Sequence, residues 1–208
     1  MMKDIALIVV DVQNDFCEGG ALAVPGSNAI IPVINRLISE FGTAVATRDW
    51  HPEGHISFAS RHPGKEPQDT VNVDGLKQVL WPDHCVPGTE GAEFHPELDL
   101  RKINLILHKG NKKDLDSYSA FFENDQKTST GLEFYLKGLG IKEVYICGLA
   151  ADVCVYYTAQ DALKTGFKTT VISDATKGVV NPPESTQKVF DDIAGKGGII
   201  TDSEDILS

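Results

Sequence analysis

Three side chains in the sequence could together carry out nucleophilic chemistry: Asp11, Lys109 and Cys154. Each lies at the end of, or shortly after, an apolar run typical of a buried strand. A cysteine thiolate can attack a carbonyl carbon, a carboxylate can accept the thiol proton, and a nearby ammonium group lowers the thiol pKa. The helix expected after GLAAD places Cys154 in its first turn, where the helix macrodipole also stabilises a thiolate. We therefore expect a cysteine nucleophile.

Each of these residues also has a simpler structural interpretation. Taken alone, Asp11 is more typical of a helix cap, Lys109 of a solvated lysine, and Cys154 of a small buried core residue. For Cys147, inside the run VYIC, the core interpretation is the better one. The functional interpretation therefore depends on the three residues meeting at one edge of a sheet.

A second set of residues has the types that bind a divalent metal ion. Asp49 and His51 are separated by one residue, and His55 follows four residues later. His84 lies in the motif WPDHC, where Cys85 is a further candidate, although two adjacent side chains can seldom reach one ion. Aspartate and imidazole suit zinc, manganese or iron. The other histidines have no comparable partner: His62, His95 and His108.

Alternating strand and helix patterns must position these side chains. The expected strands are Ile5–Val10, Ala44–Ala46, Ile103–Leu107, Glu143–Cys147, Thr169–Ile172 and Gly198–Ile200. The expected helices are Asn28–Phe41, Thr130–Leu139, Asp152–Thr165 and Glu184–Ala194. This alternation predicts an α/β fold: a doubly wound, mostly parallel, six-stranded sheet with helices on both faces, in a Rossmann-type three-layer arrangement. Ligands of such sheets bind beyond the carboxyl ends of the strands, where the reactive residues fall.

The length of 208 residues predicts a single domain, 1–208. It contains one long irregular stretch at about 50–97, which we expect to be a functional loop. Lys plus Arg number 19 and Asp plus Glu number 30, a net charge of −11 that disfavours nucleic acid and anionic membranes as partners. The four cysteines show no CxxC spacing, and the short apolar run near the N-terminus resembles neither a signal peptide nor a membrane span. We expect a cytoplasmic protein.

Several motifs together resemble the nicotinamidase family within the isochorismatase-like cysteine hydrolases. They are ALIVVDVQNDFCEGGALAVPG, TRDWHPEGHISFASRH, LWPDHCVPGT, GAEFHP, HKGNKKDLDSYSAF, EVYICGLAADVCV and TTVISDAT. DVQNDF with a later VCV marks the superfamily, whereas DWHP, HISFASRH and WPDHCV resemble its metal-dependent nicotinamidases. The resemblance extends over nearly the whole chain and implies the isochorismatase-like form of the predicted fold.

The resemblance also implies a reaction and a role for each matched residue. The reaction is hydrolysis of nicotinamide to nicotinic acid and ammonia through a Cys154 thioester, in NAD salvage, with pyrazinamide as an alternative substrate. The matched residues are the triad Asp11, Lys109 and Cys154; an oxyanion hole from the Ala150 and Cys154 N–H groups, after a cis Leu149–Ala150 peptide; the pocket residues Phe16, Trp81 and Tyr118; and the metal ligands Asp49, His51 and His84. His55 stands where some relatives place a further ligand and others leave water.

The implied cofactor is one divalent ion, zinc, with iron or manganese as alternatives. Its expected role is to position the pyridine ring, and the alternative role is to lower the pKa of the attacking water. A homo-oligomer is a family-level expectation. Rival interpretations are an amidase of the same superfamily acting on a carbamoyl or ureido group, an isochorismate-type hydrolase, and a non-catalytic metal-binding protein. A flavodoxin-like cofactor binder would need a glycine-rich phosphate loop after the first strand, which Gly19–Gly20 does not provide.

Overall fold

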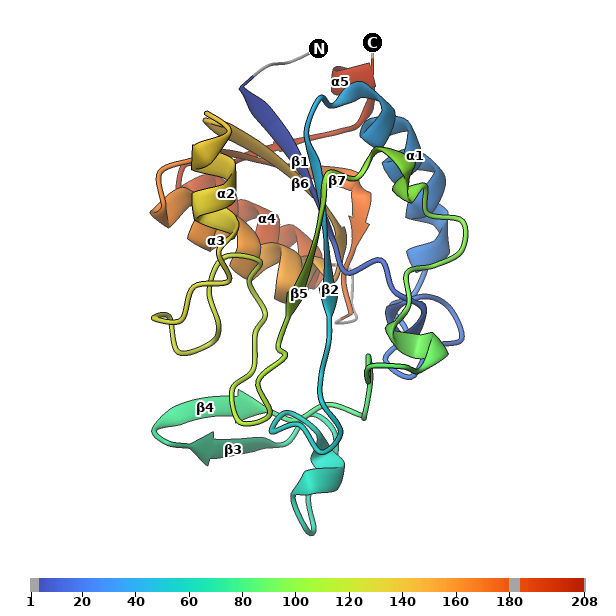
Figure 1. The fold of residues 1–208 in the computed structure, drawn as a ribbon, viewed down its shortest axis with the longest axis vertical. Helices are drawn as coiled ribbons and strands as arrows, with labels where there is room; N and C mark the ends of the chain where they lie inside the picture. The colour runs from blue at the N-terminus through green and yellow to red at the C-terminus, as the bar shows by residue number, and fades with distance from the viewer. Residues whose placement is uncertain (1–3, 180–183, 208) are drawn as a thin grey trace.

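The computed structural model describes residues 4–179 and 184–207. A central parallel sheet is covered on one face by α1 (Ile31–Glu40) and α5 (Glu204–Leu207). Its other face is covered by α2 (Leu132–Gly138), α3 (Tyr156–Lys164) and α4 (Glu184–Gly195) (Figure 1). The predicted three-layer α/β fold is thereby confirmed.

All six predicted strands are present in the sheet. They are β1 (Ile5–Val10), β2 (Ala44–Asp49), β5 (Leu105–Lys109), β6 (Glu143–Leu149), β7 (Lys168–Lys177) and β8 (Ile199–Thr201). The strand order is β5-β2-β1-β6-β7-β8, and every pairing in this sheet is parallel. Most strands extend further at their carboxyl ends than the apolar runs suggested, because polar residues such as Asp49 and Lys109 still pair with a neighbouring strand.

The strands are apolar on both faces because both faces are covered. In β1, Leu7 and Val9 pack into the core beneath α1, whereas Ile8 and Val10 pack into the core beneath α2, α3 and α4. On α1, the apolar residues recur at helical spacing on the face turned toward the sheet: Ile31, Ile34, Leu37 and Ile38. The continuous apolar runs that predicted strands therefore reflect burial on both sides.

Three predicted helices begin later than expected. The helix predicted from Asn28 begins at Ile31, after a 3-10 turn over Ser27–Ile30. Gly131 has φ +94°, so α2 begins at Leu132 rather than at Thr130. The predicted helix over residues 152–165 is divided into a π-helical turn, Ala151–Val155, followed by α3. Single π-helical turns are rare and are frequent at functional sites.

The chain direction across the sheet reverses between β1 and β6. From β1 the chain proceeds to β2 and β5 on one side, and then returns to place β6 on the other side of β1. This reversal is the topological switch point at which open α/β sheets bind their ligands. Asp11 follows β1 and Cys154 follows β6, so the two residues lie on either side of it.

The long segment at about 50–97 contains secondary structure that we did not predict from the sequence. The strands β3 (Thr70–Val73) and β4 (Leu76–Val79) form an antiparallel hairpin, seen at the lower end of the molecule in Figure 1. The alternation in TVNV and the Asp74–Gly75 turn, in which both residues have positive φ, are a hairpin signal that could have predicted it. Among the described helices, none has the length and hydropathy needed to cross a membrane.

Candidate active site and metal centre

The ammonium group of Lys109 is the centre of a buried polar cluster. Its side chain is fully buried, and its Nζ lies 2.9 Å from Asp11 Oδ2 and 3.4 Å from Cys154 Sγ. It also donates hydrogen bonds to the Ser117 carbonyl, at 3.1 Å, and to Asp49 Oδ1. Burial alone would lower the pKa of Lys109, but the two carboxylates raise it well above its ordinary value. The lysine is therefore a permanent cation between two acids and a thiol.

Asp11 is held in place by its backbone and by two side chains. It has φ +51°, so the chain turns out of the sheet directly after β1. Its Oδ1 accepts a hydrogen bond of 2.7 Å from the Thr47 hydroxyl, and its Oδ2 forms the ion pair with Lys109. Burial raises the pKa of Asp11 to about 6, against the opposing effect of Lys109. Asp11 is therefore a weak base that is ionised at neutral pH.

The Cys154 thiol faces the cavity from the π-helical turn. Burial raises the pKa of Cys154 well above its ordinary value, and the attraction of Lys109 only partly offsets this effect. Lys109 therefore acts on the Cys154 pKa in the expected direction, but the net shift is upward, so the resting thiol is neutral and its proton must be transferred to a carboxylate. The physical reason is that complete burial and two nearby carboxylates outweigh one ammonium group. Nucleophilic attack from this site requires transfer of the thiol proton to a base such as Asp11.

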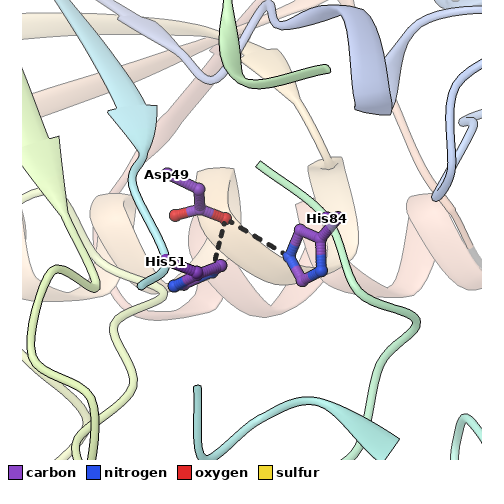
Figure 2. A group of neighbouring side chains, drawn as sticks. All are labelled: Asp49, His51 and His84. Carbon is purple, nitrogen blue, oxygen red and sulfur yellow. Dashed lines mark ion pairs between the residues drawn. The ribbon is translucent and has the colours of Figure 1, made fainter. Parts of the chain in front are cut away.

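Asp49, His51 and His84 converge on one another, as Figure 2 shows, and Asp49 links them to the cluster by its hydrogen bond from Lys109. The Nε2 atoms of His51 and His84 lie 3.4 and 3.8 Å from Asp49 Oδ2, and all three side chains are buried. Ligand atoms around a tetrahedral zinc ion with bonds of about 2.1 Å are about 3.4 Å apart. The spacing of these three groups therefore fits one metal ion.

The second nitrogen of each imidazole supports the same interpretation. His51 Nδ1 donates to the Gly110 carbonyl at 2.9 Å, and His84 Nδ1 donates to the Pro82 carbonyl at 2.7 Å. Such hydrogen bonds leave the Nε2 lone pairs available as ligands and fix the ring orientation. Gly110 is required here, since a Cβ at this position would lie 2.4 Å from His51 Cε1. Both histidines are therefore oriented as metal ligands are.

His55 lies beside this group without joining it. Its ring stacks on that of His51 with 4.2 Å between centroids, its Nδ1 is 2.7 Å from the Ser57 hydroxyl, and its Nε2 is 3.4 Å from the Leu115 carbonyl. The ligand atoms of His55 cluster instead with those of His51 and Asp116. The structure thus brings three of the four candidate ligands together, and the role of His55 stays a prediction.

One cavity, with about 410 Å³ of space including the part open to solvent, is lined by both the thiol and the candidate metal ligands. Phe16, Trp81 and Tyr118 line it, as does Ala150, and the Leu149–Ala150 peptide is cis, as the resemblance implied. The Tyr118 hydroxyl accepts a hydrogen bond of 3.3 Å from Trp81 Nε1, which joins two walls of the cavity. Aromatic side chains therefore line the same cavity as Cys154 and the candidate metal ligands.

Sequence reasoning missed several residues that line the cavity: Leu22, Val24, Asp116, Val153 and Val179. Leu22 and Val24 alternate along ALAVPG, a period-two signal that could have suggested a half-buried segment. Asp116, which is buried, accepts a hydrogen bond of 2.7 Å from Gln78 on β4. That contact joins the unpredicted hairpin to the cavity wall, so local patterns could not have revealed it.

Comparison with known proteins identifies relatives of this chain. The isochorismatase domain model matches residues 5–205. A nicotinamidase of Acinetobacter baylyi is 56% identical over 177 residues, which cover 85% of this chain and 83% of the relative.

Two solved structures are also similar over nearly their whole length. A nicotinamidase/pyrazinamidase of Acinetobacter baumanii has a TM-score of 0.94 and 50% identity, covering 98% of both chains. A pyrazinamidase of Pyrococcus horikoshii in complex with zinc has a TM-score of 0.79 and 41% identity, covering 96% of this chain and 99% of that one. The chain therefore belongs to the isochorismatase domain family, in the branch that contains these nicotinamidases.

Proposed function

We propose that this protein is a cysteine amidohydrolase that converts nicotinamide to nicotinic acid and ammonia, with pyrazinamide as a second substrate. The observation that carries the proposal is the shared cavity, which has Cys154 with Asp11 and Lys109 at one end and Asp49, His51 and His84 at the other. The similarity to nicotinamidases supports the choice of amide. The 1–208 chain acts as one hydrolase domain in this proposal.

The proposed chemistry begins with a proton transfer inside the buried cluster. Asp11 accepts the Cys154 proton and becomes neutral while Lys109 stabilises the resulting thiolate, and the thiolate attacks the amide carbon. Backbone N–H groups of Ala150 and Cys154 then stabilise the developing oxyanion. Asp11 returns the proton to the departing ammonia, which leaves a thioester on Cys154.

Asp11 and Cys154 also take part in the hydrolysis of the thioester. Asp11, again a carboxylate, accepts a proton from the attacking water, and Cys154 leaves as the thiolate. Lys109 retains its proton throughout, because both neighbouring carboxylates hold its pKa high. The side chains of Phe16 and Trp81 hold the ring and keep the amide next to the sulfur.

The proposal includes one divalent metal ion bound by Asp49, His51 and His84. The donor set of one carboxylate and two neutral imidazoles suits zinc, as well as iron or manganese. When bound, such an ion supplies a Lewis acid to which a heteroaromatic nitrogen or a water molecule can coordinate. The zinc complex of the Pyrococcus pyrazinamidase supports zinc as the first candidate.

The proposed cellular setting is NAD salvage in the cytoplasm. All four cysteines are free thiols, which suits a reducing compartment. The product acid and ammonia are small and diffusible, so the proposal requires neither a nucleic acid nor a membrane partner.

Ammonia release from a panel of amides tests the proposal, with metal content determined on the same sample. We expect turnover of nicotinamide and pyrazinamide. Benzamide, which has the same ring size but no ring nitrogen, should be a poor substrate because it lacks the atom that a metal could bind. Preference for a carbamoyl or ureido amide would instead favour another branch of the family, and a lack of turnover on every amide would favour a non-catalytic protein.

A further inference from the structure

Gln13 is a buried amide whose hydrogen bonds all go to the backbone of other segments. Its Oε1 accepts from the Asp49 N–H at 2.7 Å, and its Nε2 donates to the Asp49 carbonyl and the Ala92 carbonyl, each at 2.9 Å. The side chain is fully buried. Gln13 therefore contacts the backbone on both sides of a candidate metal ligand without belonging to the ligand group itself.

The departure of β1 from the sheet explains this arrangement. The last paired residues of β1 and β2 are Val10 and Thr47, and the Asp11 N–H still donates to the Thr47 carbonyl at 3.2 Å. Backbone groups two residues apart on a strand point to the same side, so those of Asp49 face the side that β1 has left. The amide of Gln13 takes the place of the missing strand. It forms hydrogen bonds with the buried N–H and carbonyl groups of Asp49, which the absent strand would otherwise have paired.

Asp15 makes a comparable contact with the segment that carries His84. Its Oδ2 accepts a hydrogen bond of 2.7 Å from the Cys85 N–H, and its Oδ1 accepts one of 3.3 Å from the Ala21 N–H. Cys85 has φ +50°, an unfavourable backbone conformation for a residue with a side chain. Gly91 also packs against the carboxylate, where a Cβ would lie 2.2 Å from Oδ2. Asp15 thus fixes the turn directly after His84.

We infer that Gln13 and Asp15 are positioning residues that hold Asp49 and His84 at the spacing a metal ion requires. The inference rests on the metal site of the proposed function. Gln13 fixes the backbone of the first ligand, and Asp15 fixes the backbone that follows the second. Both come from the turn after β1, so one short segment sets the relative position of two segments that are distant in the sequence. Preorganisation of ligands in this way raises metal affinity, because less ordering is required on binding.

Titration of the metal-stripped full-length protein with Co²⁺, followed by visible absorption, tests this role. The variants are Gln13→Met, which keeps the chain length but removes all three hydrogen bonds, and Asp15→Ala. Asp15→Asn is the conservative variant, since its amide oxygen can still accept from the Cys85 N–H. Asn104→Ala is the matched control, because Asn104 Oδ1 accepts from the Ala44 N–H at 2.8 Å, at the other end of β2.

We expect Gln13→Met and Asp15→Ala to raise the Co²⁺ dissociation constant by about 10- to 100-fold, the usual effect of removing an outer-shell partner. Asp15→Asn should restore most of the affinity. Asn104→Ala should lower the thermal midpoint while leaving the dissociation constant unchanged. This contrast separates a positioning role from a general loss of stability.

Folded variants that bind Co²⁺ as tightly as the wild type would overturn the inference. If Gln13→Met does not fold, the comparison of Asp15→Ala with Asp15→Asn decides it, and equal affinities in that pair would also overturn it. A wild-type protein that binds no Co²⁺ would refute the metal site of the proposed function and this inference together. Failure of the positioning role alone can therefore be distinguished from failure of the proposed metal site.

Discussion

At the scale of single residues, the site contains a buried thiol and a buried carboxylate that differ in charge at neutral pH. Burial raises the pKa of Cys154 well above its ordinary value, so the thiol is neutral at pH 7. Burial also raises the pKa of Asp11, to about 6, which leaves it ionised at that pH. Lys109 contacts both groups. The proton transfer from sulfur to carboxylate that we propose therefore takes place beside a fixed positive charge and among buried side chains.

Cys154→Ala should lower kcat for nicotinamide by roughly 10⁴-fold or more, because loss of a nucleophile removes the covalent route. The matched control is Cys147→Ala, which removes a thiol that is equally buried but lies in the core within β6. It should remain active. Steady-state ammonia release measures both variants, and intact-protein mass spectrometry should detect an acyl adduct on the wild type only. Substantial turnover by Cys154→Ala would refute the nucleophile.

At the scale of elements, α3 contains an unfavourable buried charge. Asp161 lies in the last turn of the helix, where the macrodipole disfavours an anion, and its Oδ2 has no hydrogen-bond partner among the described residues. Burial raises the pKa of Asp161 above its ordinary value, despite Ser119 and the Lys164 charge. Because the pKa of Asp161 is higher in the folded than in the unfolded chain, the protonated carboxyl favours the folded state. This stabilisation is complete below about pH 4 and is lost as the pH rises.

Asp161→Asn should therefore raise the free energy of unfolding at pH 7 by about 0.3–1 kcal/mol, the usual size of a helix-dipole effect. Since the wild-type carboxyl becomes neutral on acidification, the difference should shrink toward zero near pH 4. Urea denaturation at the two pH values measures it.

Asp192 is the control for this prediction, because its pKa shift has the opposite sign. Its hydrogen bond with Lys196 and that with the Tyr156 hydroxyl lower its pKa. Asp192→Asn should therefore lose stability at pH 7 rather than gain it. An Asp161→Asn variant that is less stable than the wild type at pH 7 would contradict the assignment of Asp161 as an unfavourable charge.

At the scale of the whole molecule, the candidate metal site joins the sheet to the long segment that covers its edge. Asp49 ends β2, whereas His84 lies beyond the β3–β4 hairpin. A ligand that binds only the folded state stabilises it by about 2.7 kcal/mol at a hundredfold excess over its dissociation constant. Metal binding should therefore stabilise the complete fold and not only the site.

Chelation should accordingly lower the thermal midpoint by several degrees and abolish ammonia release, and added Zn²⁺ should restore both. His84→Ala, which removes one of the three converging ligands, should unfold at the same temperature with and without Zn²⁺. Differential scanning calorimetry measures the shifts. Full activity in a chelated sample shown to contain no metal would refute metal dependence.

The homo-oligomer suggested by the resemblance stays a prediction.

The sequence by itself determined the layers of the fold and the edge at which chemistry could occur. Strand β1 begins and ends where its apolar run does, because burial on both faces demands that run and Asp11 ends it. The motifs that predicted the family depend on local identity and spacing, which the sequence displays directly.

The tertiary structure alone decided the electrostatic balance and the positioning contacts. The net shift of the Cys154 pKa depends on how completely other elements bury the thiol, which its position near a helix start and beside Lys109 does not reveal. The ring nitrogens of His55 face Ser57 and Leu115, a preference set by packing rather than by spacing. Gln13 finds its partners only because β1 leaves the sheet before β2 ends. Such effects arise between segments distant in the chain, and no local pattern records them.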